Sequence, residues 1–194
     1  MRPFLIAAAT TLALLPAVTF AQAQKPAAAQ KPAAAAQKPA EKAPEKKDAH
    51  IGHYGDWDVF ESADGKNKTC YMATIAKETK GGGARKDKSY VMVMHRPAAK
   101  SVGVVSVTSG YVFKDASEPV AEIGAEKFTL YTSPKTPDTA WAREDAKVVQ
   151  AMLKGQIMVV KGNPAKGDAA TDTYSLTGIS KAYQELNKAC GVKS

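Results

Sequence analysis

Short runs of alternating or wholly apolar residues, separated by turn residues, constrain the fold of this 194-residue chain most strongly. In the first run, Trp57 and Val59 alternate with Asp56 and Asp58, and this period of two is typical of a strand. Later runs are rich in Val, Thr, Tyr and Phe, which favour strands. They are Thr69–Ala76, Tyr90–His95, Val102–Thr108, Tyr111–Phe113, Val120–Ile123, Lys127–Thr132, Gln156–Val160 and Thr173–Leu176.

The turn clusters indicate how these strands are connected. They recur at short intervals, at residues 63–67, 80–83, 109–110, 114–115 and 162–164. A parallel sheet would need strands that alternate regularly with helices, and the sequence shows no such alternation. We therefore predict a mainly β fold, an antiparallel β-sandwich.

Two segments instead have the three- and four-residue spacing of amphipathic helices. The first is Arg143–Lys154, which has acidic residues in its first turn and Gly155 after its end. The second is Ile179–Cys190, which Gly191 closes. We expect the second helix to lie on the sheet with Cys190 facing inward.

The first 23 residues have the three parts of an export signal. Arg2 supplies a positive charge, residues 4–20 are almost wholly apolar, and Ala21–Ala23 forms a small-x-small cleavage site. This pattern predicts a cleaved signal peptide. A retained membrane anchor is the alternative, against which Pro16 and the cleavage site weigh. Lipidation needs a Cys just after the apolar run, and the first Cys is Cys70.

Residues 24–53 are expected to form a disordered linker. A Gln-Lys-Pro-Ala unit occurs three times, at 24–27, 30–33 and 37–40. Pro, Ala, Gln and Lys offer too little apolar surface to offset the entropy of folding. The regular lysines could also contact anionic lipid or glycan, but a solubilising spacer is the simpler interpretation. The folded domain is then expected to span residues 54–194.

The composition excludes several protein classes. With 14 Gly, 11 Pro and 2 Cys, the chain is neither collagen-like nor a disulfide-dense miniprotein. No apolar run after the signal peptide is long enough for a transmembrane span. The net charge of the chain is +8. Residues 1–50 hold seven basic and three acidic groups, so they account for +4 of this charge. The remaining chain is therefore only mildly basic.

The two cysteines are expected to pair with each other. Cys70 lies on the second predicted strand and Cys190 ends the last predicted helix. Export would carry both to an oxidising compartment, where one intramolecular disulfide is the economical interpretation. Free thiols or an intermolecular bridge are the alternatives. A redox role is not expected, because there is no Cys-x-x-Cys motif.

Motifs for catalysis or metal binding are weak throughout, so we predict no enzyme activity, no cofactor and no metal. His50 and His53 could chelate a metal only loosely, because no third ligand is evident. His95 could act as a base, but a hydrogen-bonded histidine at a strand end is the simpler interpretation. Asp56 and Asp58 could form a carboxylate pair, but solvated surface groups are more usual at this spacing.

One basic stretch is the best candidate contact surface. Its cations flank the glycines at 81–83, where a flexible loop could let them converge on phosphate or sulfate. A solvated loop is the simpler alternative. The stretch has few aromatic residues, so nucleic-acid binding is not supported. The candidate anion-contact residues are Lys77, Lys80, Arg85, Lys86 and Lys88.

Eight short segments, in this order, resemble the invasion-associated locus B family. They cover essentially the whole folded part, and both cysteines are in place. The long linker and the basic loop near Gly81 depart from the family and leave the choice of partner open. The segments are Gly55–Val59, Lys68–Tyr71, His95–Pro97, Gly110–Phe113, Ala140–Ala142, Ala151–Gly155, Asp172–Gly178 and Ala189–Cys190.

The resemblance implies an exported protein with an immunoglobulin-like β-sandwich and a cysteine pair, to which the two short helices expected above are added. The signal peptide and the linker also resemble those of alphaproteobacterial members. It brings no catalytic or metal motif. We expect a noncatalytic binding protein of the periplasm, the outer surface or the secreted fraction, whose partner is an envelope glycan, lipopolysaccharide or a host surface. A periplasmic structural or stress factor without host contact is the alternative, and an envelope-acting enzyme is a third. The sequence does not define the oligomeric state.

Overall fold

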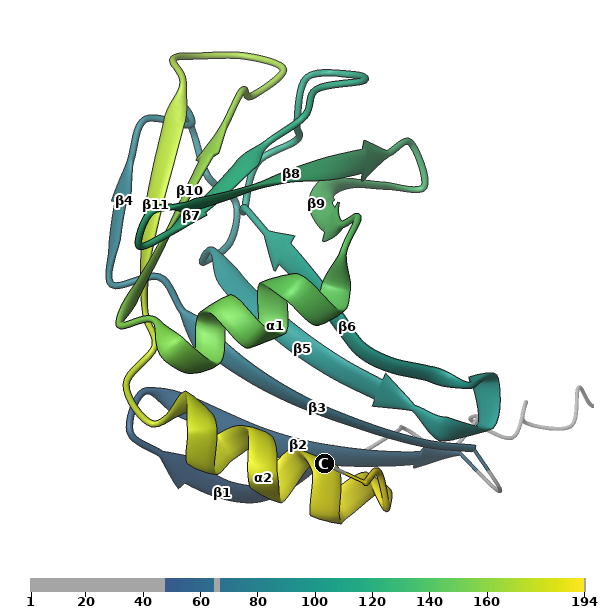
Figure 1. Ribbon diagram of the computed structural model, residues 1–194. Helices are drawn as coiled ribbons and strands as arrows, with labels where there is room; N and C mark the ends of the chain where they lie inside the picture. The colour runs from purple at the N-terminus through teal and green to yellow at the C-terminus, as the bar shows by residue number, and fades with distance from the viewer. Residues whose placement is uncertain (1–47, 65–66, 194) are drawn as a thin grey trace, which may run out of the picture. The chain divides into compact units, whose positions relative to one another are not determined.

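The computed structural model describes residues 48–64 and 67–193, so the expected signal peptide and most of the linker lie outside the described residues. Within these ranges the chain forms antiparallel strands, two α-helices and one 3₁₀ turn (Figure 1). The helices are α1 (Asp145–Lys154) and α2 (Ile179–Cys190), and the 3₁₀ turn is Pro97–Ala99. The strands are β1 (Ala49–Tyr54), β2 (Trp57–Asp64), β3 (Asn67–Ile75), β4 (Glu78–Lys80), β5 (Tyr90–Arg96), β6 (Ser101–Thr108), β7 (Val120–Ile123), β8 (Glu126–Ser133), β9 (Thr136–Ala142), β10 (Ile157–Gly162) and β11 (Ala170–Ser175).

The strands follow one another in the order β1-β2-β3-β5-β6-β9-β8-β7-β10-β11-β4. The last strand of this order, β4, directly follows β3 in the chain. Across the link between them, the Ala76 N–H donates to the Ser89 carbonyl and the Lys77 N–H to the Thr173 carbonyl, at 2.9 and 2.8 Å. The chain thus passes from the half that holds β3 and β5 to the half that holds β10 and β11, and β11 lies against β3 at this crossing (Figure 1).

The core lies on one face of the strands β2, β3, β5 and β6. Alternate residues of these strands are buried, among them Trp57, Met72, Val93 and Val105, each 0% exposed. Burying a side chain of this size stabilises the fold by about 1.5–3 kcal/mol. Helix α2 packs on β2 and β3, and helix α1 packs on β6. The core is therefore built between the strands and the two helices.

Helix α2 is held at both ends. At its start, Gly178 has a φ of +87°, and a Cβ there would lie 2.1 Å from the carbonyl oxygen of Tyr54, which only glycine avoids. At its end, Gly191 takes the left-handed conformation that commonly closes helices. A disulfide joins Cys190 to Cys70 of β3, the pairing expected from the sequence. The helix is thus tied to the β1–β2 turn and to the sheet.

The predicted fold class, a mainly β antiparallel sandwich with two helices, is confirmed. Helix α2 has the predicted bounds, whereas α1 begins at Asp145 rather than Arg143. Regular structure begins with β1 at Ala49, inside the segment expected to be linker. Its residues pair with β2, the next strand along the chain, and this hairpin is not visible in the composition.

Two further elements differ from the sequence prediction. Residues Tyr111–Phe113 form no strand but a loop with a single bridge from Phe113 to Pro164. Both aromatic rings of this loop are buried, which explains the apolar pattern. Strand β9 was not predicted, because Pro137 and Asp138 near its start favour turns. Strand β4 lies inside the expected basic loop and pairs with β11.

In the described part of the chain, neither helix has the length and apolar character needed to cross a membrane.

Candidate functional site

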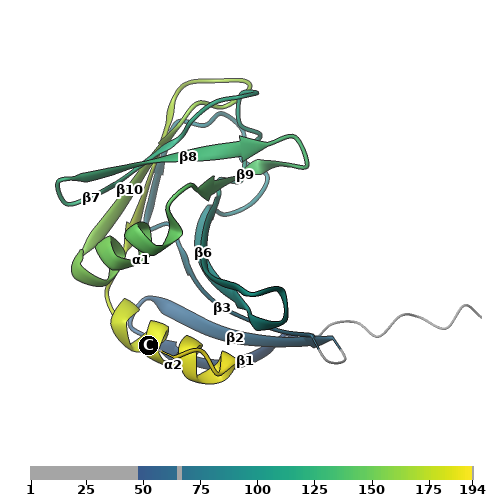
Figure 2. The ribbon, with the colours of Figure 1, turned by 45° about the vertical axis from the view of Figure 1, so that its right-hand side comes forward.

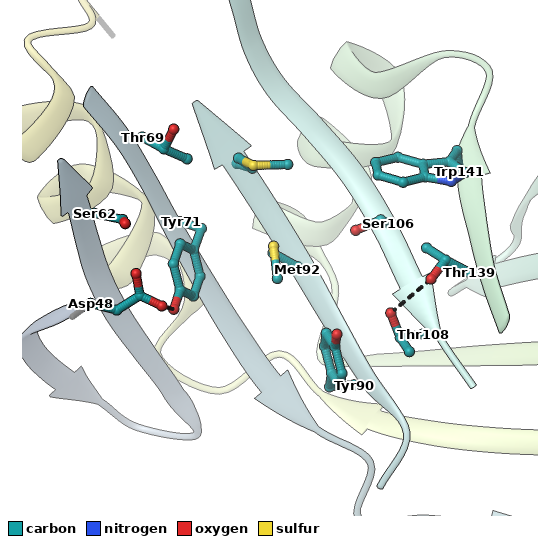
Figure 3. Close-up of a pocket in the computed structure, with 11 residues that line it drawn as sticks. Asp48, Ser62, Thr69, Tyr71, Tyr90, Met92, Ser106, Thr108, Thr139 and Trp141 are labelled. Carbon is teal, nitrogen blue, oxygen red and sulfur yellow. Dashed lines mark hydrogen bonds between the residues drawn. The ribbon is translucent and has the colours of Figure 1, made fainter. Parts of the chain in front are cut away.

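The face of the sheet opposite the core carries a groove with a volume of about 440 Å³ (Figure 3). The same strands that bury Val91 and Val93 present Tyr90 and Met92 on this side, because successive side chains of a strand point to opposite faces. The lining consists mainly of aromatic, thioether and hydroxyl side chains. These residues are Asp48, Ser62, Thr69, Tyr71, Tyr90, Met92, Met94, Ser106, Thr108, Thr139 and Trp141.

The strand register produces the hollow. Met92 of β5 lies opposite Ser106 of β6, which in turn lies opposite Trp141 of β9. On the other side, Met92 lies opposite Ala73 of β3. Met92 therefore stands between two small side chains, and Trp141 has Ser106 on one side and Tyr131 of β8 on the other. Tyr90 lies further along β5, opposite Thr108 of β6 (Figure 3).

The polar groups of the groove are uncharged except at one end. The Tyr71 hydroxyl donates to Asp48 Oδ2 at 2.7 Å. Burial, and then this hydrogen bond, raise the pKa of Tyr71, so its phenol stays protonated and donates. Further along, the Oγ1 atoms of Thr108 and Thr139 lie 3.2 Å apart. Among the described residues that line the groove, none is Lys, Arg or His.

His95, which the sequence offered as a possible base, has a structural role. It is 0% exposed. Its Nδ1 accepts a hydrogen bond from the Gly103 N–H at 2.8 Å, so the ring proton is on Nε2, which donates to Asn187 Oδ1 of α2 at 2.8 Å. The ring therefore connects β5 and β6 to helix α2, on the core side of the sheet and away from the groove.

The two aspartates considered as a pair bind different partners. Asp56 accepts a hydrogen bond from Lys77 Nζ at 2.6 Å, which holds the pKa of its carboxyl below the ordinary value. At Asp58, burial raises the pKa, but hydrogen bonds from His50 and His53 outweigh it and the net pKa is lowered. Both carboxyls are thus stabilised as anions, which is the opposite of the shared proton that an acid–base dyad needs.

His50 Nε2 and His53 Nδ1 both lie within 3.0 Å of Asp58 Oδ1. The two histidines, considered above as a loose chelating pair, therefore serve to hold β1 against β2. Within residues 48–64 and 67–193, no group of three or more His, Cys, Asp or Glu side chains is arranged to hold a metal ion.

The five candidate anion-contact residues do not form one cluster of exposed charge. Lys77 pairs with Asp56, and Lys80 pairs with Glu78 at 3.0 Å. The other three lie in the loop after β4. There, Lys86 and Lys88 are exposed and make no ion pair with any described residue, whereas the Arg85 side chain is only 14% exposed.

Arg85 is part of a buried polar network. Its Nη1 and Nη2 donate to the two carboxylate oxygens of Asp172 at 3.1 and 2.6 Å. The Ser89 hydroxyl donates to the same carboxylate at 2.7 Å, and the Arg85 guanidinium lies 4.9 Å from the centre of the Tyr111 ring. The Arg85 guanidinium is therefore already bound to a buried carboxylate, and its contacts serve the interior of the fold.

Sequence reasoning missed both the groove and the role of Asp172. Asp172 alternates with Ala170 and Tyr174 on the buried face of β11, so its position in the pattern marks it as a buried charge. The groove has a weaker signal, the Tyr-Val-Met-Val-Met run at 90–94, in which both faces of one strand are apolar. A sheet with apolar side chains on both faces needs a cover on each, and the described helices contact the core face only (Figure 2).

Comparison with known proteins finds a matching family model and similar solved structures. The family model described as "Invasion associated locus B (IalB) protein" matches residues 57–187. A crystal structure of invasion associated protein B from Bartonella henselae is similar, with a TM-score of 0.51 and 17% sequence identity over 71% of this chain and 95% of that chain. At this identity the similarity concerns the fold alone. No curated protein matches the chain.

Proposed function

Because the chain belongs to the invasion-associated locus B family, we propose that it is an exported, noncatalytic binding protein of the cell envelope that contributes to contact with host cells. One observation carries the proposal, the groove on the face of the sheet that the described helices leave uncovered. An apolar surface with a few polar groups is the usual form of a binding site.

The state of the other candidate groups supports a role in binding rather than catalysis. His95 is buried and uses both ring nitrogens, and Asp56 and Asp58 each have cationic or imidazole partners. A catalytic site would bring a nucleophile, a base and an orienting group together within a cleft. The groove lining instead combines aromatic rings, thioethers and neutral hydroxyls.

The disulfide and the first 23 residues support export. A bond between Cys70 and Cys190 persists in an oxidising compartment and is rare in the cytosol. The expected signal peptide would deliver the chain there. Periplasmic and surface locations are both compatible with these features, so the location relative to the outer membrane separates a host-contact role from an internal envelope role.

Protease treatment of intact cells tests the proposal. The full chain carries a C-terminal epitope tag, and a known periplasmic protein serves as the control for lysis. Host contact predicts that the tagged domain or its tether is cleaved while the periplasmic control survives. Protection until the outer membrane is opened would overturn host contact and favour the alternative, a periplasmic structural or stress factor.

A second measurement tests whether the groove is the contact surface. Fluorescently labelled mature protein is added to host cells, and retention is compared for the wild type, Tyr90→Ala and Ile157→Ala. Both residues are on the sheet, but only Tyr90 lines the groove, and Ile157 is an exposed residue of β10. We expect Tyr90→Ala alone to reduce retention. Equal retention of all three proteins would contradict a binding role for the groove.

A further inference from the structure

We propose that the groove binds a neutral glycan chain, with the rings of Tyr90, Trp141 and Tyr71 packed against the C–H faces of its sugars. This inference rests on the proposed function, because it names the ligand class of the same surface. Four properties of the groove carry it, namely its aromatic and hydroxyl lining, its charge, its size and the strands from which it is built.

The lining matches the amphipathic surface of a sugar. A pyranose ring has apolar C–H faces and a rim of hydroxyl groups. The groove offers flat rings from three strands, β3, β5 and β9, and between them the hydroxyls of Ser106, Thr108 and Thr139 (Figure 3). Tyr and Trp have few rotatable bonds, so they supply large contact areas at a low entropic cost. Met92 adds a polarizable floor between them.

The charge of the groove selects a neutral ligand. Asp48 is the one charged side chain among the described lining residues, and its carboxylate accepts a hydrogen bond from Tyr71. Among the described lining residues there is no Lys, Arg or His to pair with an acidic sugar or a lipid phosphate. The exposed lysines Lys86 and Lys88 border other surface hollows instead. Anionic ligands are therefore disfavoured at the groove.

The size fits a short segment of a chain. A volume of about 440 Å³ lies within the range of about 300–1,000 Å³ that is typical of small-ligand sites. The lining spans the neighbouring strands β2, β3, β5, β6 and β9, and at about 4.8 Å between strands this distance is about 19 Å. The groove is open at its sides, so a longer glycan can continue beyond it.

The position of these strands argues against an added peptide strand. Each of β3, β5, β6 and β9 has a paired strand on both sides. Their backbone N–H and C=O groups are therefore used within the sheet, and the groove presents side chains only. A bound peptide would leave most of its own backbone without partners, which is costly when that backbone is desolvated. A sugar has no such backbone to satisfy.

The experiment uses the full mature protein on a printed array that holds both neutral and acidic glycans. The variants are Trp141→Phe, Trp141→Ala and Tyr90→Ala, and Ile157→Ala on the exposed surface of β10 is the control outside the groove. We expect retention on neutral glycans, which falls about tenfold or more in the alanine variants of Trp141 and Tyr90, less in Trp141→Phe, and stays unchanged in Ile157→Ala. Thermal unfolding of each variant establishes that it is folded.

Titration in solution follows, with the neutral glycan that is retained best. Trp57 is fully buried, so a change in tryptophan fluorescence on binding reports Trp141. Retention on acidic glycans alone, or no neutral glycan retained above the Trp141→Ala level, would overturn the inference. If host-cell retention still depends on Tyr90 in that case, the groove binds another ligand and the proposed function survives. If that dependence is also absent, both proposals fail.

Discussion

The two faces of the strands β3, β5, β6 and β9 differ in composition and in what covers them. The core face carries Met72, Val93 and His95, all 0% exposed, and helix α2 is joined to it by a disulfide and a hydrogen bond. The outer face carries tyrosines, methionines, hydroxyl residues and Trp141, and it forms an open groove. One set of strands therefore provides both a closed core and a solvent-accessible surface rich in aromatic rings.

This difference shows how polar groups are used on each side. On the core side, every polar group has to be paired, because an unsatisfied buried group costs about 1–3 kcal/mol. His95, Ser89 and Asp172 are accordingly held by two or more partners. On the outer side, Ser106 and Thr139 are also buried, but Tyr71, Tyr90 and Thr108 are partly exposed, so their hydroxyls can exchange water for a ligand at little cost.

The largest expected effect comes from breaking the buried ion pair. Arg85→Ala leaves the Asp172 carboxylate, which is 2% exposed, without its bidentate partner. We expect the free energy of unfolding to fall by about 3–5 kcal/mol, because an uncompensated charge remains in the core. Urea unfolding measures the change.

The neighbouring exposed cation provides the control for this experiment. Lys86→Ala should change the stability by less than about 0.5 kcal/mol. The double change Arg85→Leu and Asp172→Leu should recover much of the loss. Similar urea midpoints for Arg85→Ala and Lys86→Ala would show that the pair is not buried in solution.

Removal of the disulfide is expected to have the second largest effect. The bond closes a loop with a sequence separation of 120 residues. In the chain-entropy model such a closure stabilises by about 4–5 kcal/mol, and measured losses are typically about 2–5 kcal/mol. The double variant Cys70→Ala, Cys190→Ala should therefore have a much lower urea midpoint. Wild-type protein treated with a reductant should behave in the same way, and an unchanged midpoint in both would refute the role of the bond.

A pair of methionines compares the two faces directly. Met72 of β3 lies in the core and is 0% exposed, whereas Met92 of the adjacent strand β5 lines the groove. We expect Met72→Ala to lower the free energy of unfolding by about 2–5 kcal/mol through the cavity that it leaves. Met92→Ala should cost about 1 kcal/mol or less. Equal losses would mean that the outer face is covered in the protein in solution.

The smallest expected effect concerns pH on the outer face. Hydrogen bonds from His50 and His53 lower the pKa of Asp58 in the folded state. The resulting stability is present above the unfolded pKa of about 3.9 and is lost as pH falls through the folded pKa. Asp58→Asn should therefore be less stable than the wild type at neutral pH, by less than about 1 kcal/mol for this solvent-exposed group.

The measurement is the urea midpoint of both proteins between neutral pH and pH of about 2. The two midpoints should converge at the acidic end, where Asp58 is protonated in the wild type. A difference that persists at the lowest pH would mean that the charge of Asp58 is not the cause.

Much of the fold could be predicted because it depends on local patterns. The bounds of α2 follow from apolar residues three and four apart and from Gly191, and β5 and β7 follow from alternation within a few residues. Strands β1, β4 and β9 were missed because their own residues favour turns or solvent. They are strands because a neighbouring strand offers them hydrogen bonds. That neighbour is next along the chain for β1, but distant in the sequence for β4 and for the β6 edge of β9.

The same limit applies to the candidate residues. Arg85 has the sequence context of an exposed basic loop, and only the approach of β11 brings Asp172 to it. His95 likewise acquires its partners from β6 and α2.

By itself, the sequence determined the strand-rich class, the two helices and the two cysteines that the disulfide joins, because periodicity and residue type act over short distances. Only the tertiary structure decided which face of each strand became the core and which became the groove. Both faces of β5 are apolar, and the choice between them depends on where helix α2 is attached and how the strands are registered. These contacts join residues far apart in the chain, so no local pattern contains them.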